Sequence, residues 1–303
     1  MIAQRPTPDL IGSYWTLAAG AHPWTSQEYC PYSLPERAAA AATSGFRGMG
    51  FWHTDLKHLR TAHSFREMKA TLNSHGIIHV EVEFLLDWFM TGERRAQSDE
   101  MRCFLLDAAE GLGASHLKVG DFFNEQCTLD RMVECFAELC RQGRERGINV
   151  LYEVTPRPFS RINTIEEALM LIRQADAPNG GLMLDLWHLV RMGITPDDLR
   201  RNLGPSDLIR AELNDGSMTP PEDIVDATVN HRMFVGEGEF DIHGFLSSMR
   251  DVGYAGPYGV EVLDANVRDW PLESVARHAF ETTVRVFQGP DSQMDAGYAE
   301  VRS

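Results

Sequence analysis

The segment DLIRAELNDG (residues 207–216) is the most informative part of the chain for its architecture. As a strand, it would place its three apolar side chains on one face and Arg210, Glu212 and Asn214 on the other. A solvated edge strand produces this pattern, and so does a buried strand that carries Glu212 to a functional site. The rest of the chain distinguishes these two interpretations.

Seven further short apolar segments resemble this one, and each is followed by a segment with helical periodicity. The candidate strands are 10–18, 48–52, 77–84, 116–120, 149–154, 181–186, 208–213 and 258–263. The candidate helices are 34–44, 55–74, 98–112, 128–147, 164–176, 195–203, 241–252 and 270–287. Several helices carry N-cap signals at their starts or a glycine after their ends, which supports these assignments.

This alternation predicts an α/β fold, a (β/α)8 TIM barrel. A doubly wound open sheet is the alternative, but no candidate strand leads into a glycine-rich dinucleotide fingerprint. The GEGEF segment (236–240) lies before a helix without a preceding strand. Because no Gly/Ser-rich linker interrupts the pattern, we expect one domain over 1–303, with the barrel at about 10–287 and a C-terminal tail at 288–303.

The composition argues against several functional classes. The net charge of −16 repels phosphate backbones, so we expect no nucleic-acid partner. No apolar run approaches the roughly 20 residues that span a bilayer, and the N-terminus lacks the apolar core of an export signal. The five cysteines form no CxxC motif and are expected to be buried free thiols in a reducing cytoplasm.

Acidic residues end four consecutive candidate strands. In a TIM barrel, functional groups gather at the C-terminal ends of the strands, and these ends carry Glu153, Asp185, Glu212 and Glu261. Four acids at one mouth repel one another unless a cation neutralises them. Carboxylates suit Mn²⁺ or Mg²⁺, with Co²⁺ as a further candidate. Glu212 is therefore interpreted as a metal ligand rather than a solvated edge residue.

At these residues the chain resembles the sugar phosphate isomerase/epimerase family. This group of xylose-isomerase-like TIM barrels belongs to a superfamily that also contains the family 2 apurinic (AP) endonucleases. The similarity extends from IGSYWTL to ETTVRVF, nearly the whole chain. Its most specific parts are YEVTP (152–156), LMLDLWHL (182–189), AELNDG (211–216), RMFVGEGEFD (232–241) and YAGPYGVEVL (254–263).

The resemblance implies roles for individual residues. It implies that a divalent metal is bound by four carboxylates: Glu153, Asp185, Glu212 and Glu261. Glu153 and Glu261 would also be catalytic, exchanging the proton at the reacting carbon. His188, three residues after the aspartate, and Arg232, before the GxG loop, would bind substrate.

The strand-seven position departs from the family pattern. Many of these epimerases have histidine there in an HxxD arrangement, whereas this chain has Glu212 followed by Asp215 at the same spacing. The all-carboxylate set is closer to that of xylose isomerase. Because it is harder and more negative, it disfavours Zn²⁺.

This site suits removal of a proton next to a carbonyl through a metal-stabilised enediolate. Return of the proton on the opposite face gives epimerisation, and return at the neighbouring carbon gives aldose–ketose isomerisation. Loss of a β-hydroxyl instead gives a lyase. We therefore predict a metal-dependent isomerase or epimerase of a keto sugar or related polyol. The alternative is a lyase on the same substrate class, either an inosose-type dehydratase or a 3-keto-glycoside deglycosidase.

Two other functional classes remain as weaker hypotheses. A DNA-repair endonuclease shares the fold, but it needs more histidine ligands and a basic DNA-facing surface. A metal-stabilised protein without catalysis would not need the paired glutamates. The sequence leaves open both a homo-oligomer and a partner subunit.

Several residues near the expected mouth have two interpretations. Lys118 ends strand four and is predicted to bind a substrate oxygen, although a salt-bridged lysine fits equally well. His53 and Glu83 are further candidates for the lining of the mouth. Three tryptophans, Trp15, Trp52 and Trp88, are expected either to stack on a sugar ring or to pack in the core. The loop at residues 87–97 is a candidate lid or partner contact.

Overall fold

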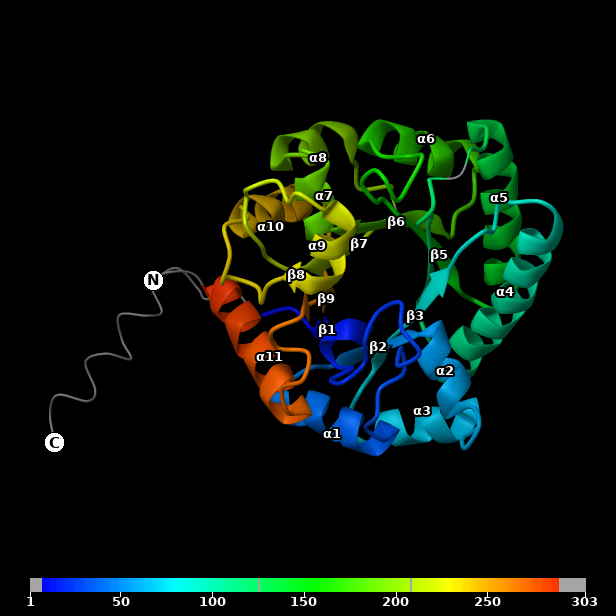
Figure 1. Cartoon of the computed structure of the whole chain (residues 1–303). Coiled ribbons are helices and arrows are strands. Elements are labelled where there is room, and N and C mark those ends of the chain that lie inside the picture. The colour runs from blue at the N-terminus through cyan, green and yellow to red at the C-terminus, as the bar shows by residue number, and fades with distance from the viewer. Residues whose placement is uncertain (1–6, 125, 208, 289–303) are drawn as a thin grey trace, which may run out of the picture.

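Eight parallel strands form a closed barrel in the computed structural model, which describes residues 7–124, 126–207 and 209–288. Figure 1 looks into this barrel and shows the helices arranged around it. The barrel closes where β1 pairs with β9, with Leu10 opposite Tyr258. Its strands are β1 (Leu10–Gly12), β2 (Gly48–Trp52), β3 (His79–Leu85), β4 (His116–Val119), β5 (Asn149–Glu153), β6 (Gly180–Asp185), β7 (Ile209–Leu213) and β9 (Tyr258–Val260).

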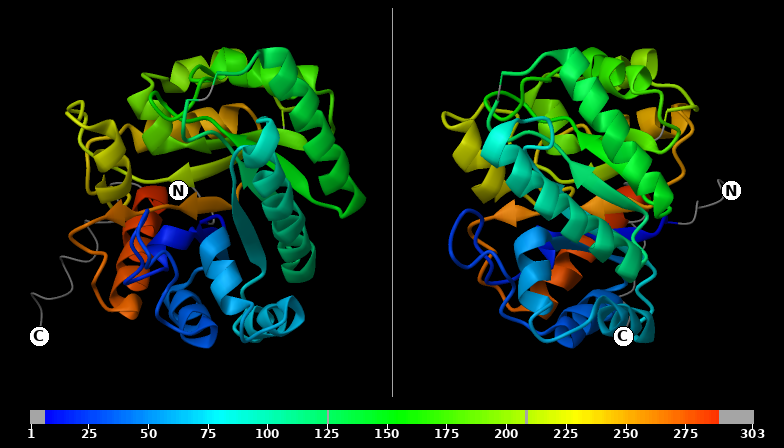
Figure 2. Two further views of the ribbon diagram at one scale, coloured as in Figure 1. Left: turned by 45° about the vertical axis from the view of Figure 1, so that its right-hand side comes forward. Right: turned by 90° about the vertical axis from the view of Figure 1, so that its right-hand side faces the viewer.

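The helices alternate with these strands, and the long α4 and α5 lie along the outer wall of the barrel (Figure 2). The longer helices are α1 (Leu34–Ser44), α3 (Phe65–Ser74), α4 (Gly92–Leu112), α5 (Leu129–Glu145), α6 (Ile165–Gln174), α10 (Ile242–Asp251) and α11 (Leu272–Gln288). The shorter ones are η1 (Tyr14–Thr16), α2 (His53–Leu59), α7 (Leu186–Arg191), α8 (Pro196–Asn202) and α9 (Ile224–Asn230).

Hydrophobic periodicity explains how each long helix packs. In α5, the residues Met132, Phe136, Leu139 and Cys140 recur on one face and are all buried. Thr128 caps the start of this helix by accepting a hydrogen bond from the backbone N–H of Arg131. The same logic holds for the other outer helices, so the core fills the space between helices and strands.

The structure corrects several predicted boundaries. The first strand ends at Gly12, because the chain turns into η1 instead of continuing to residue 18. The helix predicted at 55–74 is two helices, α2 and α3, separated where Ser64 and Glu67 form a capping box that starts α3. The 289–303 part of the predicted tail lies outside the described residues.

The candidate lid at 87–97 is wrong in its extent. Helix α4 already begins at Gly92, so only the preceding residues form a loop. Arg94 donates from Nη2 to Asp87 Oδ1 at 2.6 Å, which ties the first turn of the helix to that loop. The segment is therefore a short, pinned connection.

Two short strands outside the barrel were not predicted. β8 (His231–Arg232) pairs antiparallel with β10 (Leu263–Asp264), and the pair lies beside α9. This pairing holds Arg232 next to the end of β9.

Within the described part of the chain, no helix is both long and apolar enough to cross a bilayer. All five cysteines are free, but Cys103 is exposed and Cys127 is half-buried, contrary to the expectation of burial.

Candidate active site

The strand register brings the four predicted acidic residues together. Asp185 on β6 and Glu212 on β7 are directly paired, Glu153 ends β5, and Glu261 directly follows β9. One carboxylate oxygen from each of the four lies within 4.8 Å of those of the others. All four residues are at most 5% exposed. They therefore form one buried acidic cluster at the C-terminal end of the barrel.

Glu212 fits into this cluster because its neighbour on β9 has no side chain. Gly259 pairs in register with Glu212, and a Cβ atom at Gly259 would lie 2.5 Å from Cγ of Glu212. Any larger residue would displace the carboxylate, so this glycine is needed for space.

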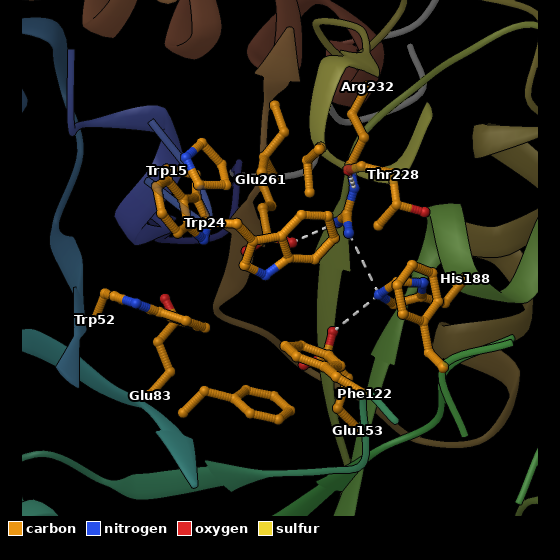
Figure 3. Close-up of a pocket in the computed structure, with 15 residues that line it drawn as sticks. Trp15, Trp24, Trp52, Glu83, Phe122, Glu153, His188, Thr228, Arg232 and Glu261 are labelled. Atoms are coloured by element: carbon orange, nitrogen blue, oxygen red, sulfur yellow. Dashed lines mark hydrogen bonds and ion pairs between the residues drawn. The ribbon is translucent and has the colours of Figure 1, made fainter. Parts of the chain in front are cut away.

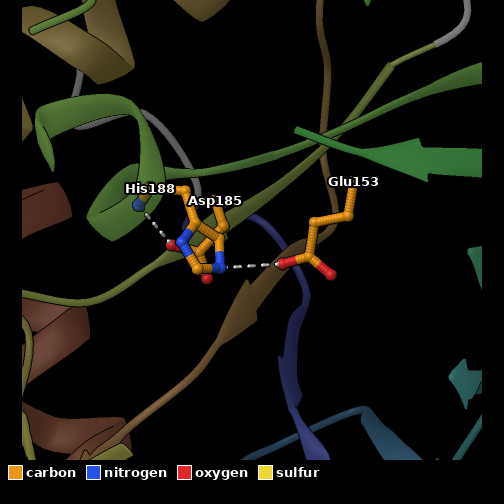
Figure 4. A group of neighbouring side chains, drawn as sticks. All are labelled: Glu153, Asp185 and His188. Carbon is orange, nitrogen blue, oxygen red and sulfur yellow. Dashed lines mark hydrogen bonds and ion pairs between the residues drawn. The ribbon is translucent and has the colours of Figure 1, made fainter. Parts of the chain in front are cut away.

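His188 is positioned by the residue that precedes its helix. Asp185 is the N-cap of α7, and its Oδ1 accepts a hydrogen bond from the backbone N–H of His188 at 3.3 Å. Asn214 donates to the same oxygen at 2.9 Å. The imidazole Nε2 then lies 3.4 Å from Oε1 of Glu153 (Figure 4). Glu153, Asp185 and His188 are thus a second set of close ligand atoms in the same site.

Arg232 is the cation on one side of the cluster. Its Nη1 lies 3.0 Å from Oδ2 of Asp185 and 2.5 Å from Oε2 of Glu261, and its Nε donates to the carbonyl oxygen of Thr228. Burial alone would raise the pKa of Asp185, but the Arg232 guanidinium, His188 and the hydrogen bond from Asn214 together outweigh it and lower that pKa to about 2. Asp185 therefore stays ionised.

Lys118 is the cation on the other side. Its Nζ lies 2.5 Å from Oε2 of Glu83 and 2.8 Å from Oε1 of Glu212, and Ser13 Oγ donates to the same oxygen of Glu212 at 2.7 Å. Burial disfavours the ammonium, but the surrounding glutamates, Glu212 and Glu83 foremost, together outweigh it and raise the pKa of Lys118 well above its usual value. Its predicted contact with substrate stays a prediction, since the structure places its ammonium between two carboxylates.

Ser13 was missed from the sequence. It directly follows the first strand, where a small polar residue gives no periodic signal.

Asp215, at the fourth position of the ExxD motif, does not belong to the acidic cluster. Its carboxylate accepts backbone hydrogen bonds from Gly216, Gly236 and Phe240 and so shapes the loop after Arg232.

The cluster fits a divalent cation. Oε2 of Glu212 is buried and has no hydrogen-bond partner among the described residues. Among the residues that the structure describes, Lys118 and Arg232 are the two permanent cations that contact the five carboxylates of the site (Glu83, Glu153, Asp185, Glu212, Glu261), so full ionisation leaves three negative charges in excess before His188 is counted. Burial raises the pKa values of Glu212 and Glu261 well above their usual range. A bound cation would favour their ionised forms and occupy the free oxygen.

Metal addition is therefore expected to stabilise the chelated protein. At a free Mn²⁺ concentration 100 times the Kd, linkage gives about 2.7 kcal/mol, or roughly 5 °C in Tm. Differential scanning calorimetry measures this shift, with the Asp185→Asn variant expected to show a smaller one. Sodium chloride at matched ionic strength is the control. A chelated protein whose Tm does not change with Mn²⁺, Mg²⁺ or Co²⁺ would contradict the metal site.

A pocket opens above this cluster. Glu83, Glu153, His188, Arg232 and Glu261 contribute its charged lining. The rest is largely aromatic, as Figure 3 shows for Trp15, Trp24, Trp52 and Phe122. The sequence pattern indicates Trp15 and Trp52 but not Trp24, which lies in a turn without periodicity, or Thr228, which lies on the short helix α9.

Two of the weaker candidates lie elsewhere. Trp88 is 1% exposed, packs against Phe136 and Tyr152, and donates from Nε1 to the carbonyl oxygen of Gly120. It is a core residue, so the stacking role considered for it is wrong. His53 is not among the pocket residues, and burial lowers its pKa to about 4, so it is a neutral residue packed on Trp52.

Comparisons with known proteins agree with the barrel fold. The family model for xylose isomerase-like TIM barrels matches residues 38–285. The chain is 26% identical over 250 residues to the 3-dehydroshikimate dehydratase of Pseudomonas aeruginosa, covering 80% of this chain and 38% of that protein. It is 25% identical over 187 residues to the inosose isomerase of Bacillus licheniformis, covering 60% of this chain and 66% of that protein.

The chain thus spans less than two thirds of the length of each of these two relatives. Among solved structures, the IOLI protein with a bound zinc atom aligns with a TM-score of 0.79 at 19% identity, covering 92% of this chain and 98% of that one. At this identity the structural likeness speaks for the fold alone.

Proposed function

The chain belongs to the xylose isomerase-like TIM barrel family, and from this we propose that it is a divalent-metal-dependent isomerase or epimerase of a keto sugar or related polyol. The observation that carries the proposal is the buried cluster of four carboxylates beneath the pocket. We assign Glu153, Asp185, Glu212 and Glu261 as the metal ligands, with Mn²⁺ or Mg²⁺ preferred because every donor is a hard oxygen.

Glu153 and Glu261 are the proposed proton-transfer pair. Both line the pocket, and they reach it from different strands, β5 and the end of β9. Burial raises the pKa of Glu261 well above its usual value, which suits a group that takes and returns a proton near neutral pH. When bound, the metal ion would supply electrostatic stabilisation for the negative charge that develops next to the carbonyl.

His188 and Arg232 are the proposed substrate-orienting residues. Both line the pocket, and Arg232 Nη2 lies 3.4 Å from His188 Nε2, so their polar ends converge on one region. Arg232 is held in place by its contacts to Asp185 and Glu261, which leaves it little freedom. Such fixed donors select the orientation of a substrate with several oxygens.

A lyase on the same substrate class is the second candidate. The observation that favours it is the similarity to the 3-dehydroshikimate dehydratase, which extends over 80% of this chain, more than the 60% covered by the inosose isomerase. The first step is shared, since both reactions remove a proton next to a carbonyl. They differ in whether a β-substituent leaves before the proton returns.

Product analysis in D₂O separates these outcomes. The protein is incubated with Mn²⁺ and with ketoses, inososes and keto glycosides. The Mn²⁺ is then removed with a chelator, and the products are examined by NMR and mass spectrometry. An isomerase or epimerase incorporates carbon-bound deuterium or yields an isomer of unchanged composition, whereas a lyase yields a product that has lost water or an aglycone. Activity that persists in full after exhaustive chelation would rule out the proposed metal dependence.

A further inference from the structure

One wall of the pocket is a continuous row of aromatic rings, which we call the aromatic arc. The ring centroids of Trp15 and Trp52 are 5.4 Å apart, and those of Trp52 and Phe84 are 6.2 Å apart. Phe84 stacks on Phe122 at 4.7 Å, and Phe122 meets Phe159 edge-on at 6.0 Å. All five rings line the same pocket. Such a chain of ring contacts fixes the wall as one rigid apolar surface.

The aromatic arc faces a charged side. In Figure 3, Trp15 and Trp52 lie on one side of the space, and His188 and Arg232 lie on the other. The carboxylates of Glu153 and Glu261 belong to the same pocket. A ligand that fills it therefore meets polar donors and acceptors at one end and apolar rings at the other.

Trp24 covers the mouth from the loop between β1 and α1. It is 53% exposed and has a φ of 59°, a left-handed conformation that is costly for a bulky residue. Its backbone N–H donates to Oε1 of Glu28 at 2.9 Å, and Oε2 of Glu28 accepts from Trp52 Nε1 and Thr54 Oγ1. Glu28 thus ties the loop that carries Trp24 to the aromatic arc.

This arrangement holds a large apolar side chain in water at the expense of backbone strain. Neither burial nor a local helix or strand explains the position of Trp24, because the ring is more than half exposed. A ligand that packs between Trp24 and the aromatic arc would remove that ring from water.

We propose that the substrate is a keto sugar or polyol that carries a planar apolar group, such as an aryl substituent, held between Trp24 and the aromatic arc. The proposal rests on the function proposed above for the charged end of the pocket. A free monosaccharide has hydroxyl groups around its ring, and burying these against five aromatic rings leaves them without partners. One aromatic ring is enough to stack on one face of a sugar. The aromatic arc and Trp24 present more apolar surface than such stacking needs.

Binding of paired glycosides tests this inference without any turnover. The probes are the phenyl and methyl β-glycosides of glucose, galactose and mannose, which have no carbonyl to react. Within at least one sugar, isothermal titration calorimetry is expected to show the phenyl glycoside binding about tenfold more tightly than the methyl glycoside. In Trp24→Ala this ratio should fall to about two or less. Trp270→Ala is the matched control, because Trp270 is also exposed, at 40%, and does not line the pocket above the acidic cluster.

Two results would overturn the inference: no aryl preference with any of the three sugars, or a preference that survives Trp24→Ala unchanged. Thermal unfolding checks that the variants remain folded, which the exposure of both tryptophans favours. The glycoside result is independent of metal-dependent chemistry. If small ketoses exchange deuterium but the phenyl glycosides bind no more tightly than the methyl glycosides, only the aryl substrate is rejected. If the phenyl glycosides bind more tightly but no substrate exchanges deuterium, only the proposed reaction is rejected.

Discussion

Replacing Glu261 by glutamine is expected to lower the rate of proton exchange by about 10²–10⁴-fold. Glutamine keeps the size of the side chain, and its amide oxygen can accept the hydrogen bond from Arg232 that Oε2 of Glu261 accepts. It cannot take or return a proton. The measurement is deuterium incorporation into the substrate in D₂O, at saturating Mn²⁺ and under single-turnover conditions.

Two controls separate this loss from loss of metal or fold. Metal content is measured on the same sample. The variant is expected to keep its metal, because three carboxylates of the cluster remain. Glu281→Gln removes a carboxylate from the exposed side of α11 and should exchange at the wild-type rate. If Glu261→Gln kept more than a tenth of the wild-type rate with full metal content, Glu261 would have no acid–base role.

The second large effect is expected for Lys118→Met. Lys118 is 1% exposed and lies between Glu83 and Glu212, so its removal leaves two buried carboxylates without their cation. Breaking a buried ion pair on one side costs about 3–5 kcal/mol. The chelated variant should lose about this much stability in urea unfolding. Because Oε1 of Glu212 has then lost the ammonium, added Mn²⁺ should raise the Tm of the variant more than that of the wild type.

A double variant is the matched control for this result. Glu83→Gln together with Lys118→Met removes one negative and one positive charge, and it should recover part of the lost stability. The coupling between the two positions then measures their interaction. Equal stability of chelated Lys118→Met and wild type would show that the ammonium is dispensable for holding Glu212.

The positions of the four acidic residues were predictable, because each lies at or near the end of a predicted strand. Glu153, Asp185, Glu212 and Glu261 each follow a short apolar run, and in a parallel barrel the end of such a run is also a place in space. The prediction needed no knowledge of register. Since the barrel is closed, the four acidic residues must meet at one end.

Contacts across the barrel were not predictable in this way. Ser13 meets Glu212 only because the strand that precedes it pairs with β9, and Lys118 meets the same carboxylate from β4, on another side of the barrel. These contacts depend on register and on side-chain conformations, which periodicity does not encode. Trp24 was missed for a related reason, since its loop has no periodic pattern and its position depends on Glu28.

The two parts of the site come from different halves of the chain. All four acidic residues of the cluster lie between β5 and the end of β9, whereas four of the five rings of the aromatic arc, and Trp24, precede β5. A chimera made by joining the first four strand–helix units of another barrel to the last four of this one would exchange the pocket wall and leave the acidic cluster intact. Ser13, Glu83 and Lys118 would have to be carried over with it, because they hold the position of Glu212 from the exchanged half. We therefore expect such a chimera to differ in the ligands it binds while it keeps the acidic cluster.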